Sequence, residues 1–266
     1  MKDDILTAAR SKALNGLRFV LVLDVLSFFL GSIGTSKLKV LQLAYPSSWS
    51  LSPKLWTPIR IAILIFDCLF TAGIANEYDD VLKAVFLLSS RLCLSSFFEA
   101  AGTLFMKFQG SWICALFFIL SFLNSFSMIR SLHNMRNSWD LQVIVGLPTK
   151  IHFVYSLFQA IHYLEFSSSF LVELPFTFHI FSCFVLFVFL GQLIGRNRDF
   201  FLGFCSAAFV FLCNSNSFIF KRPLLFYANI ILGLLLLFES IMYTMIEKDK
   251  LRGVSESEYL YDSDSE

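Results

Sequence analysis

A long apolar run that carries charges inside it is the feature that most constrains this chain. Residues Val81–Met106 (VLKAVFLLSSRLCLSSFFEAAGTLFM) are long enough to cross a bilayer, because about 20 apolar residues span a hydrocarbon core of about 30 Å. The run contains Arg91 and, two turns later, Glu99. An arginine that faces lipid is costly, so this helix must turn Arg91 toward other helices or a hydrated cavity. The run therefore predicts a bundle of transmembrane helices around it.

The composition places the whole chain in the membrane class. Of its 266 residues, 56% are hydrophobic and 15% are charged, whereas soluble domains average about 25% charged residues. The net charge of +1 gives no field that favours a nucleic acid, and no such partner is expected. The six cysteines lie singly within apolar runs, and no motif predicts a metal site, a cofactor or a catalytic nucleophile.

Eight apolar segments predict an all-α, polytopic transmembrane helical bundle. Seven spans are the alternative, because the seventh segment is short. Pro58, Pro148, Pro175 and Pro223 each open a segment, where the missing N–H has no helical partner to lose. The segments are expected near Leu17–Gly34, Pro58–Ala75, Lys83–Phe105, Trp112–Met128, Pro148–Glu165, Pro175–Ile194, Phe200–Cys213 and Pro223–Met245.

The distribution of basic residues predicts the orientation and the tails. Lys and Arg are more frequent in the loops that lie inside when both termini are cytosolic. We expect a cytosolic N-terminal tail at residues 1–16, a transmembrane domain at 17–245 and a disordered, acidic, cytosolic tail at 246–266. In that tail Ser255 and Ser263 each precede a Glu by three residues, a pattern that predicts phosphorylation by acid-directed kinases.

The chain also lacks the usual signals of secretion and import. It shows no cleavable signal pattern, no Arg-rich presequence and no Asn-x-Ser/Thr sequon. These features favour an internal eukaryotic membrane, with the endoplasmic reticulum as the first choice.

Ionisable residues within the spans predict two polar layers. Counting helical rise from the cytosolic ends puts one residue from each of four spans at a common depth: Asp24, Asp67, Arg91 and Glu239. A second polar group is expected nearer the opposite face: Glu99, His162, Glu165 and His179. Two interpretations of the first layer are open. Either Arg91 pairs with Asp24 or Asp67 and fixes which helices touch, or the layer lines a cavity for a polar head group, an ion or a proton.

Two further patterns concern packing and anchoring. Gly191 and Gly195 form a GxxxG spacing that can seat a close helix contact. All four tryptophans lie in loops or at span ends, which predicts a belt at the membrane interface: Trp49, Trp56, Trp112 and Trp139.

Two short motifs carry a family resemblance. Leu55-Trp56-Thr57-Pro58 opens the second span after a long polar loop, and Leu147-Pro148 opens a span that continues through Tyr155-Ser156. These spots, about a quarter of the chain, resemble the polytopic relatives of the tryptophan-rich sensory, or translocator-like, membrane proteins. That family carries tryptophans within its spans, where this chain has Ile, Phe and Leu. The resemblance implies that a small lipophilic ligand binds between the helices.

Three functions are compatible with these residues. The first is a non-enzymatic multi-pass protein that binds or transports a small lipophilic or amphipathic ligand through the polar layer inside the bundle. The second is a structural or adaptor membrane protein that docks a cytosolic partner by its acidic tail. The third is an intramembrane enzyme that modifies lipids with Glu99, His162 and Glu165.

Overall fold

All secondary structure described in the computed structural model is helical. The structure describes residues 10–29, 49, 51, 53–75, 79–105, 111–133, 135, 138–167, 175–197, 199–214 and 222–263. After a first helix at residues 10–29, the elements are α2 (Pro53–Ala72), η1 (Gly73–Ala75), α3 (Asp79–Phe105), α4 (Ser111–His133), α5 (Trp139–Leu141), η3 (Gln142–Gly146), α6 (Leu147–Ser167), α8 (Pro175–Asn197), α9 (Phe200–Cys213) and α11 (Pro223–Ser263).

Six of the described helices are long and apolar enough to cross a membrane, compared with the eight spans expected. They are Lys54–Ala75, Asp79–Phe105, Trp112–His133, Trp139–Ser167, Thr177–Asn197 and Pro223–Met245. The Phe200–Cys213 helix is apolar but short. The helix at residues 10–29 carries Arg10, Lys12, Arg18 and Asp24, which dilute its apolar character, and the rest of the first expected span lies outside the described residues. The cytosolic placement of both termini stays a prediction.

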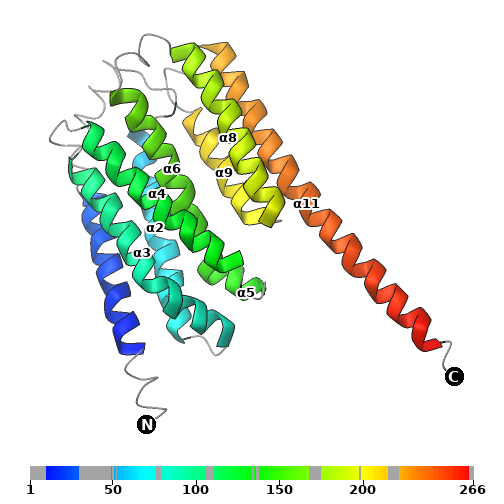
Figure 1. The fold of residues 1–266 in the computed structure, drawn as a ribbon. Helices are drawn as coiled ribbons and strands as arrows, with labels where there is room; N and C mark the ends of the chain where they lie inside the picture. Colours follow the sequence, from blue (N-terminus) through cyan, green and yellow to red (C-terminus); the bar gives the residue numbers. More distant parts are fainter. Residues whose placement is uncertain are drawn as a thin grey trace.

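The helices form two neighbouring groups. Figure 1 shows the first helix, α2, α3, α4 and α6 on one side, and α8, α9 and α11 on the other. The most extensive contacts join α4 to α6, α3 to α4, and α9 to α11. The start of the first helix and the end of α11 lie at the same end of the molecule (Figure 1).

Two of the four prolines open their helices as expected, and two do not. Pro175 and Pro223 are the first residues of α8 and α11. Pro58 lies inside α2, because that helix begins at Pro53. Pro148 lies inside the continuous Trp139–Ser167 helix, two residues after the end of the π-helical turn η3. Proline cannot donate a hydrogen bond to the residue four positions earlier, and the wider π turn accommodates this missing bond.

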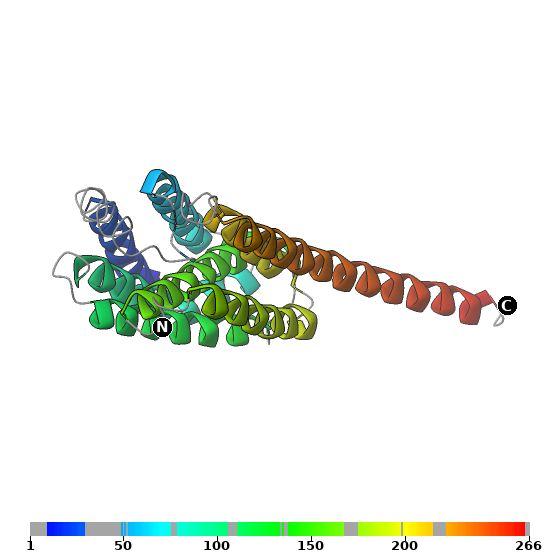
Figure 2. The same ribbon diagram turned by 90° about the horizontal axis from the view of Figure 1, so that it is seen from above.

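The last helix is longer than the sequence predicts. We expected disorder from residue 246, whereas α11 continues to Ser263. Adding residues to an existing helix is easier than starting a new one, so a polar segment can extend the Pro223–Met245 span. Viewed from above, this extension runs far beyond the bundle (Figure 2).

Two apolar clusters hold the helices together. The first helix packs on α2 and α3 through residues that include Leu17, Val20, Phe70 and Leu88. The larger cluster joins α4, α6, α8, α9 and α11. Many large side chains, such as Phe184, point outward, as expected for helices that face lipid.

Candidate functional site

A polar seam runs along the face of α3 that meets α4. Arg91, Ser95, Glu99 and Thr103 recur every four residues, a spacing that places them on one helix face. Opposite them, α4 offers serines and an asparagine at a similar spacing. The Ser95 and Ser125 hydroxyls lie 3.0 Å apart, and Asn124 donates to the Ser95 hydroxyl at 2.7 Å. The seam ends in a buried ionic cluster around Glu99.

His152 of α6 bridges two carboxylates at the centre of that cluster. Its Nδ1 lies 2.9 Å from Oε1 of Glu99, and its Nε2 lies 3.0 Å from both carboxylate oxygens of Asp67. Ser121 of α4 donates to the same Oε1 of Glu99 at 3.2 Å. Asp67, Glu99 and His152 are all buried, so three helices meet at one ionic contact.

Arg60 closes the cluster on the other side of Glu99. Its Nη1 lies 3.4 Å from Oε2 of Glu99, while its Nη2 donates to the Thr103 hydroxyl at 3.0 Å and the Tyr155 hydroxyl at 2.6 Å. The guanidinium also lies over the Tyr155 ring, 4.5 Å from its centroid, and near the Trp56 ring. Arg60 is only 2% exposed. Because arginine stays charged, this buried cation requires the carboxylate beside it.

The four ionic groups can compensate one another. Each imidazole nitrogen of His152 faces a carboxylate, an arrangement that a doubly protonated ring satisfies at both nitrogens. Asp67 and Glu99 then carry two negative charges against the two positive charges of His152 and Arg60. The cluster is therefore neutral and hydrogen-bonded, which is the condition for burying charges in a membrane domain.

Asp24 approaches this cluster from the first helix. It is 4% exposed, and its carboxyl group interacts electrostatically with Asp67, His152 and Glu99. The structure thus brings together Asp24 and Asp67 of the expected first layer, and it adds Glu99 from the expected second group. Arg60 and His152 complete the set.

Arg91 makes no ion pair with a described residue, so the interpretation that pairs it with Asp24 or Asp67 is not seen. Its Nη1 donates to the hydroxyls of Ser127 at 3.0 Å and Ser131 at 2.8 Å, and to the Ser127 carbonyl. Arg91 lies two turns from Glu99 along α3, so the ionic cluster forms at the level of Glu99 and not at that of Arg91. The serine-rich face of α4 supplies neutral acceptors instead of a carboxylate.

The remaining predicted residues are spread over the other helices. Glu239 of α11 packs against Gly191 of α8, and its Oε2 is buried without a hydrogen-bond partner. Glu165 is buried and interacts electrostatically with Cys213. His162 lies beside the Tyr163 ring, and Nε2 of His179 lies 2.8 Å from the Asn229 side-chain oxygen. The expected second group is therefore not one cluster.

Two of the four tryptophans lie where the interfacial belt predicts, and two do not. Trp112 and Trp139 are largely exposed, as a belt requires, whereas Trp49 and Trp56 are buried. The Trp49 indole donates to the Ser182 hydroxyl at 2.7 Å, which places it inside the bundle.

The GxxxG prediction is confirmed, since Gly191 lies against Glu239 and Gly195 against Tyr243, both on α11.

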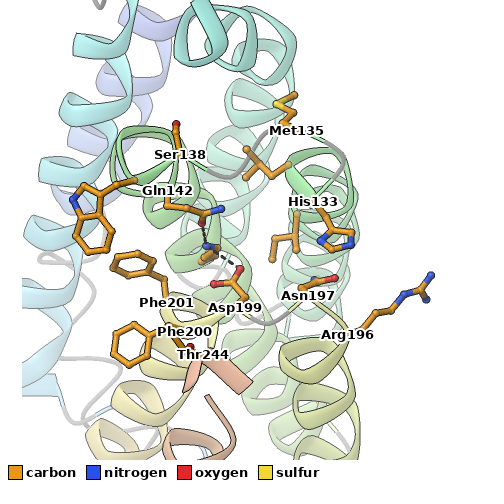
Figure 3. A pocket seen from close by; sticks show the side chains of 14 residues that line it. His133, Met135, Ser138, Gln142, Arg196, Asn197, Asp199, Phe200, Phe201 and Thr244 are labelled. Atoms are coloured by element: carbon orange, nitrogen blue, oxygen red, sulfur yellow. Dashed lines mark hydrogen bonds and ion pairs between the residues drawn. The ribbon is translucent and has the colours of Figure 1, made fainter. Parts of the chain in front are cut away.

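A polar pocket lies where α4, α5, α6, α8, α9 and α11 come together. Its volume is about 530 Å³. At its floor the buried ammonium of Lys150 lies 2.8 Å from Oδ2 of Asp199 and also bonds the Gln142 side-chain oxygen. Figure 3 shows the Gln142 and Asp199 side chains pointing toward one another at that floor.

The rim of this pocket combines cations and aromatic rings. His133 and Arg196 are exposed, and Figure 3 shows Arg196 extending outward. The Trp139 and Phe201 rings lie 5.4 Å apart, and the Lys150 ammonium lies 5.4 Å from the Phe201 ring centroid. A pocket of this kind can hold the charged end of a molecule and cover its apolar part.

A second hollow is almost wholly apolar. It has a volume of about 500 Å³ and lies between α4, α6 and α8, with Phe122, Leu157, Phe181 and Phe189 among its lining residues. It offers an apolar surface and few polar atoms.

Sequence reasoning missed several buried charges. Arg60 lies within the expected Pro58–Ala75 span but was not included among the ionisable residues of the polar layers, although its place in an apolar run could have revealed its burial. Lys150 and His152 both lie inside an expected span, and this was the available signal that the span carries buried polar groups. Their partners come from helices far away in the chain, so the contacts themselves were not readable.

Comparison with known proteins gives one extensive match. The meiotically up-regulated gene 162 protein of Schizosaccharomyces pombe is 34% identical over 253 residues, which are 95% of this chain and 96% of that protein. No protein-family model matches the chain, and no solved structure matches it. The name of the relative states no ligand or activity.

Proposed function

The chain belongs to the same family as the meiotically up-regulated gene 162 protein of Schizosaccharomyces pombe, and we propose that it is a multi-pass integral membrane protein that binds or transports a small amphipathic ligand. The ligand occupies the pocket at Lys150 with its charged end. We further propose that the protein acts in an internal membrane, with the endoplasmic reticulum favoured, and that both of its termini are cytosolic.

The single observation that carries this proposal is the composition of the pocket. Its volume of about 530 Å³ lies within the range of about 300–1,000 Å³ that small-molecule sites occupy. Lys150 and Arg196 give it positive charge, and within the described part of the chain Lys150 is the one of the two that pairs with a carboxylate, that of Asp199. The exposed Arg196 favours an anionic head group, and the aromatic rings on the rim favour an apolar body attached to it.

One further feature supports a lipophilic partner. The resemblance to tryptophan-rich sensory proteins implies a lipophilic ligand between helices. The buried ionic cluster has a different role in this proposal, because Arg60 and His152 are already paired with Asp67 and Glu99 and leave little charge for a ligand.

Tryptophan quenching by a brominated fatty acid tests the pocket. Trp139 is 71% exposed on the rim, while Trp112 is 61% exposed on the other hollow, so the two can be compared directly. The purified protein in detergent should show quenching by dibromostearate that stearate reverses. Trp139→Phe should remove this reversible component, and Trp112→Phe should keep it. Loss in Trp112→Phe alone would move the ligand to the apolar hollow and contradict the proposed pocket.

Charge at the rim gives a second measure of the same binding. Arg196→Gln should weaken dibromostearate binding about two- to fivefold, as expected for an exposed ion pair. Arg130→Gln is the matched control, because Arg130 is an exposed arginine at the end of α4 that does not line the pocket. Equal effects of the two substitutions would indicate general attraction to the positive surface and not a site.

An adaptor function is the second candidate, and the shape of α11 favours it. This helix continues well beyond the bundle (Figure 2), where a cytosolic protein has access to it on all sides. We propose that the acidic end docks such a partner and that phosphorylation of Ser255 and Ser263 strengthens the contact by adding charge. A cytosolic protein should co-purify with the full chain and be lost when Val254–Glu266 is deleted. Retention after the deletion contradicts this candidate.

A further inference from the structure

Asp24 is a buried carboxyl group that lies beside Asp67 and lacks a donor for either oxygen among the described residues. It is 4% exposed. The hydroxyls of Ser27, one turn later on the same helix, and of Ser96 on α3 are also buried, and neither has a hydrogen-bond partner within the described ranges. An ionised carboxylate in this position would be desolvated without compensation, which is strongly unfavourable.

The charged groups around Asp24 do not compensate an ionised carboxylate there. Asp67 on α2 and Glu99 on α3 interact with it as like charges, and His152 on α6 as an opposite charge. Asp67 and Glu99 are already balanced by His152 and Arg60, whose contacts they share. A charge on Asp24 would therefore leave the buried group with one uncompensated negative charge. One proton on the Asp24 and Asp67 pair removes that charge.

We propose that Asp24 and Asp67 form an exchangeable proton-binding site and that its proton holds the first helix against α2 and α3. The O–H of protonated Asp24 donates a hydrogen bond to the Asp67 carboxylate, and this is the hydrogen bond that Asp24 otherwise lacks. This inference is independent of the ligand pocket, which lies at other residues.

Release of the proton has a defined structural consequence. The first helix packs on the bundle through Leu17 and Val20, which lie on the same helix face as Asp24. An ionised Asp24 beside Asp67 opposes this packing by like-charge repulsion and by its own desolvation. The site therefore acts as a latch: the first helix is docked when the proton is bound and loosened when it is lost.

Infrared spectroscopy of the full-length protein in lipid nanodiscs tests the bound proton. At neutral pH, the protein should show the carbonyl stretch of a protonated carboxyl group. The band should shift on labelling with ¹³C-aspartate and on transfer to D₂O. It should disappear in Asp24→Asn and persist in Asp79→Asn, which changes an exposed aspartate at the start of α3. Because the isotope test uses the unaltered protein, it remains decisive if the variant fails to fold.

Hydrogen exchange tests the latch. As pH rises, amides of residues 10–29 should exchange faster in the unaltered protein than in Asp24→Asn at the same pH, because the neutral asparagine cannot ionise. Equal exchange in the two proteins would overturn the latch.

Other results would overturn the proton site itself. Absence of an aspartate band at neutral pH, or its persistence in Asp24→Asn, would do so. A band that appears only when sodium is replaced by choline would assign the positive charge to a sodium ion and also overturn it.

Discussion

Replacing Arg60 should reveal how strongly the ionic cluster holds the bundle together. Arg60→Met keeps an unbranched side chain of similar length but removes the guanidinium. Glu99 then loses its contact with a permanent cation, and the hydroxyls of Thr103 and Tyr155 lose their donor. Breaking a buried ion pair by removing one partner costs about 3–5 kcal/mol, because the other charge stays buried. We expect a loss of this size in the free energy of unfolding.

Arg91→Met is the matched control on the next helix. Arg91 bonds serine hydroxyls and a carbonyl, so its removal leaves no carboxylate uncompensated. Its loss should cost about 1–2 kcal/mol, the value of one or two hydrogen bonds. Arg60→Lys should fall between the two, because lysine keeps the charge but lacks the planar fork that reaches several acceptors.

Reversible unfolding in mixed micelles with a denaturing detergent measures these differences. A second substitution checks the cause: Glu99→Gln added to Arg60→Met restores neutrality and should recover about 1–2 kcal/mol of the loss. Equal destabilisation by Arg60→Met and Arg91→Met would refute the reasoning. So would a double variant that is less stable than Arg60→Met alone, since the uncompensated charge would then not be the cause.

Two glycine substitutions test packing at the other sites. A Cβ on Gly191 would lie 2.5 Å from a Glu239 oxygen, so the larger side chain of Gly191→Leu should displace the Glu239 carboxylate and disturb the contact between α8 and α11. We expect a cost of about 1–3 kcal/mol of unfolding free energy, measured in the same mixed micelles, and an unchanged stability would contradict the close contact. A Cβ on Gly146 would lie 2.8 Å from the Gln142 side-chain oxygen and 3.3 Å from the Lys150 ammonium. Gly146→Ala should therefore displace these two side chains at the pocket floor and weaken dibromostearate binding in the quenching assay. Unaltered binding would show that the ligand does not reach this floor.

Some parts of the site were readable from local patterns. The apolar runs predicted helices of membrane length, and the GxxxG spacing predicted a close contact that α8 and α11 make. Helical rise also placed Asp24 and Asp67 at a common depth, and the two residues do interact. These predictions succeeded because period, length and rise are properties of a single helix.

The predictions about Arg91 and Arg60 failed because a linear sequence does not show how each helix is rotated about its axis. Depth alone does not tell which way a helix is turned, so Arg91 was expected near an acid and instead faces the serines of α4. Arg60 lay beyond the expected layer, yet its long side chain reaches Glu99 and Tyr155. The rotation of each helix about its axis is set by packing against neighbours that are distant in the chain.

The sequence by itself determined that this chain forms long apolar helices with a few ionisable groups inside them, because an apolar segment of that length satisfies its own backbone hydrogen bonds in lipid when it is helical. Only the tertiary structure decided which of those groups meet. His152 stands between Asp67 and Glu99, and Arg60 compensates the second carboxylate, because α2, α3 and α6 pack with these faces together. Asp24 is left with an electrostatic contact and no donor, which is a property of the assembled helices and not of any one of them.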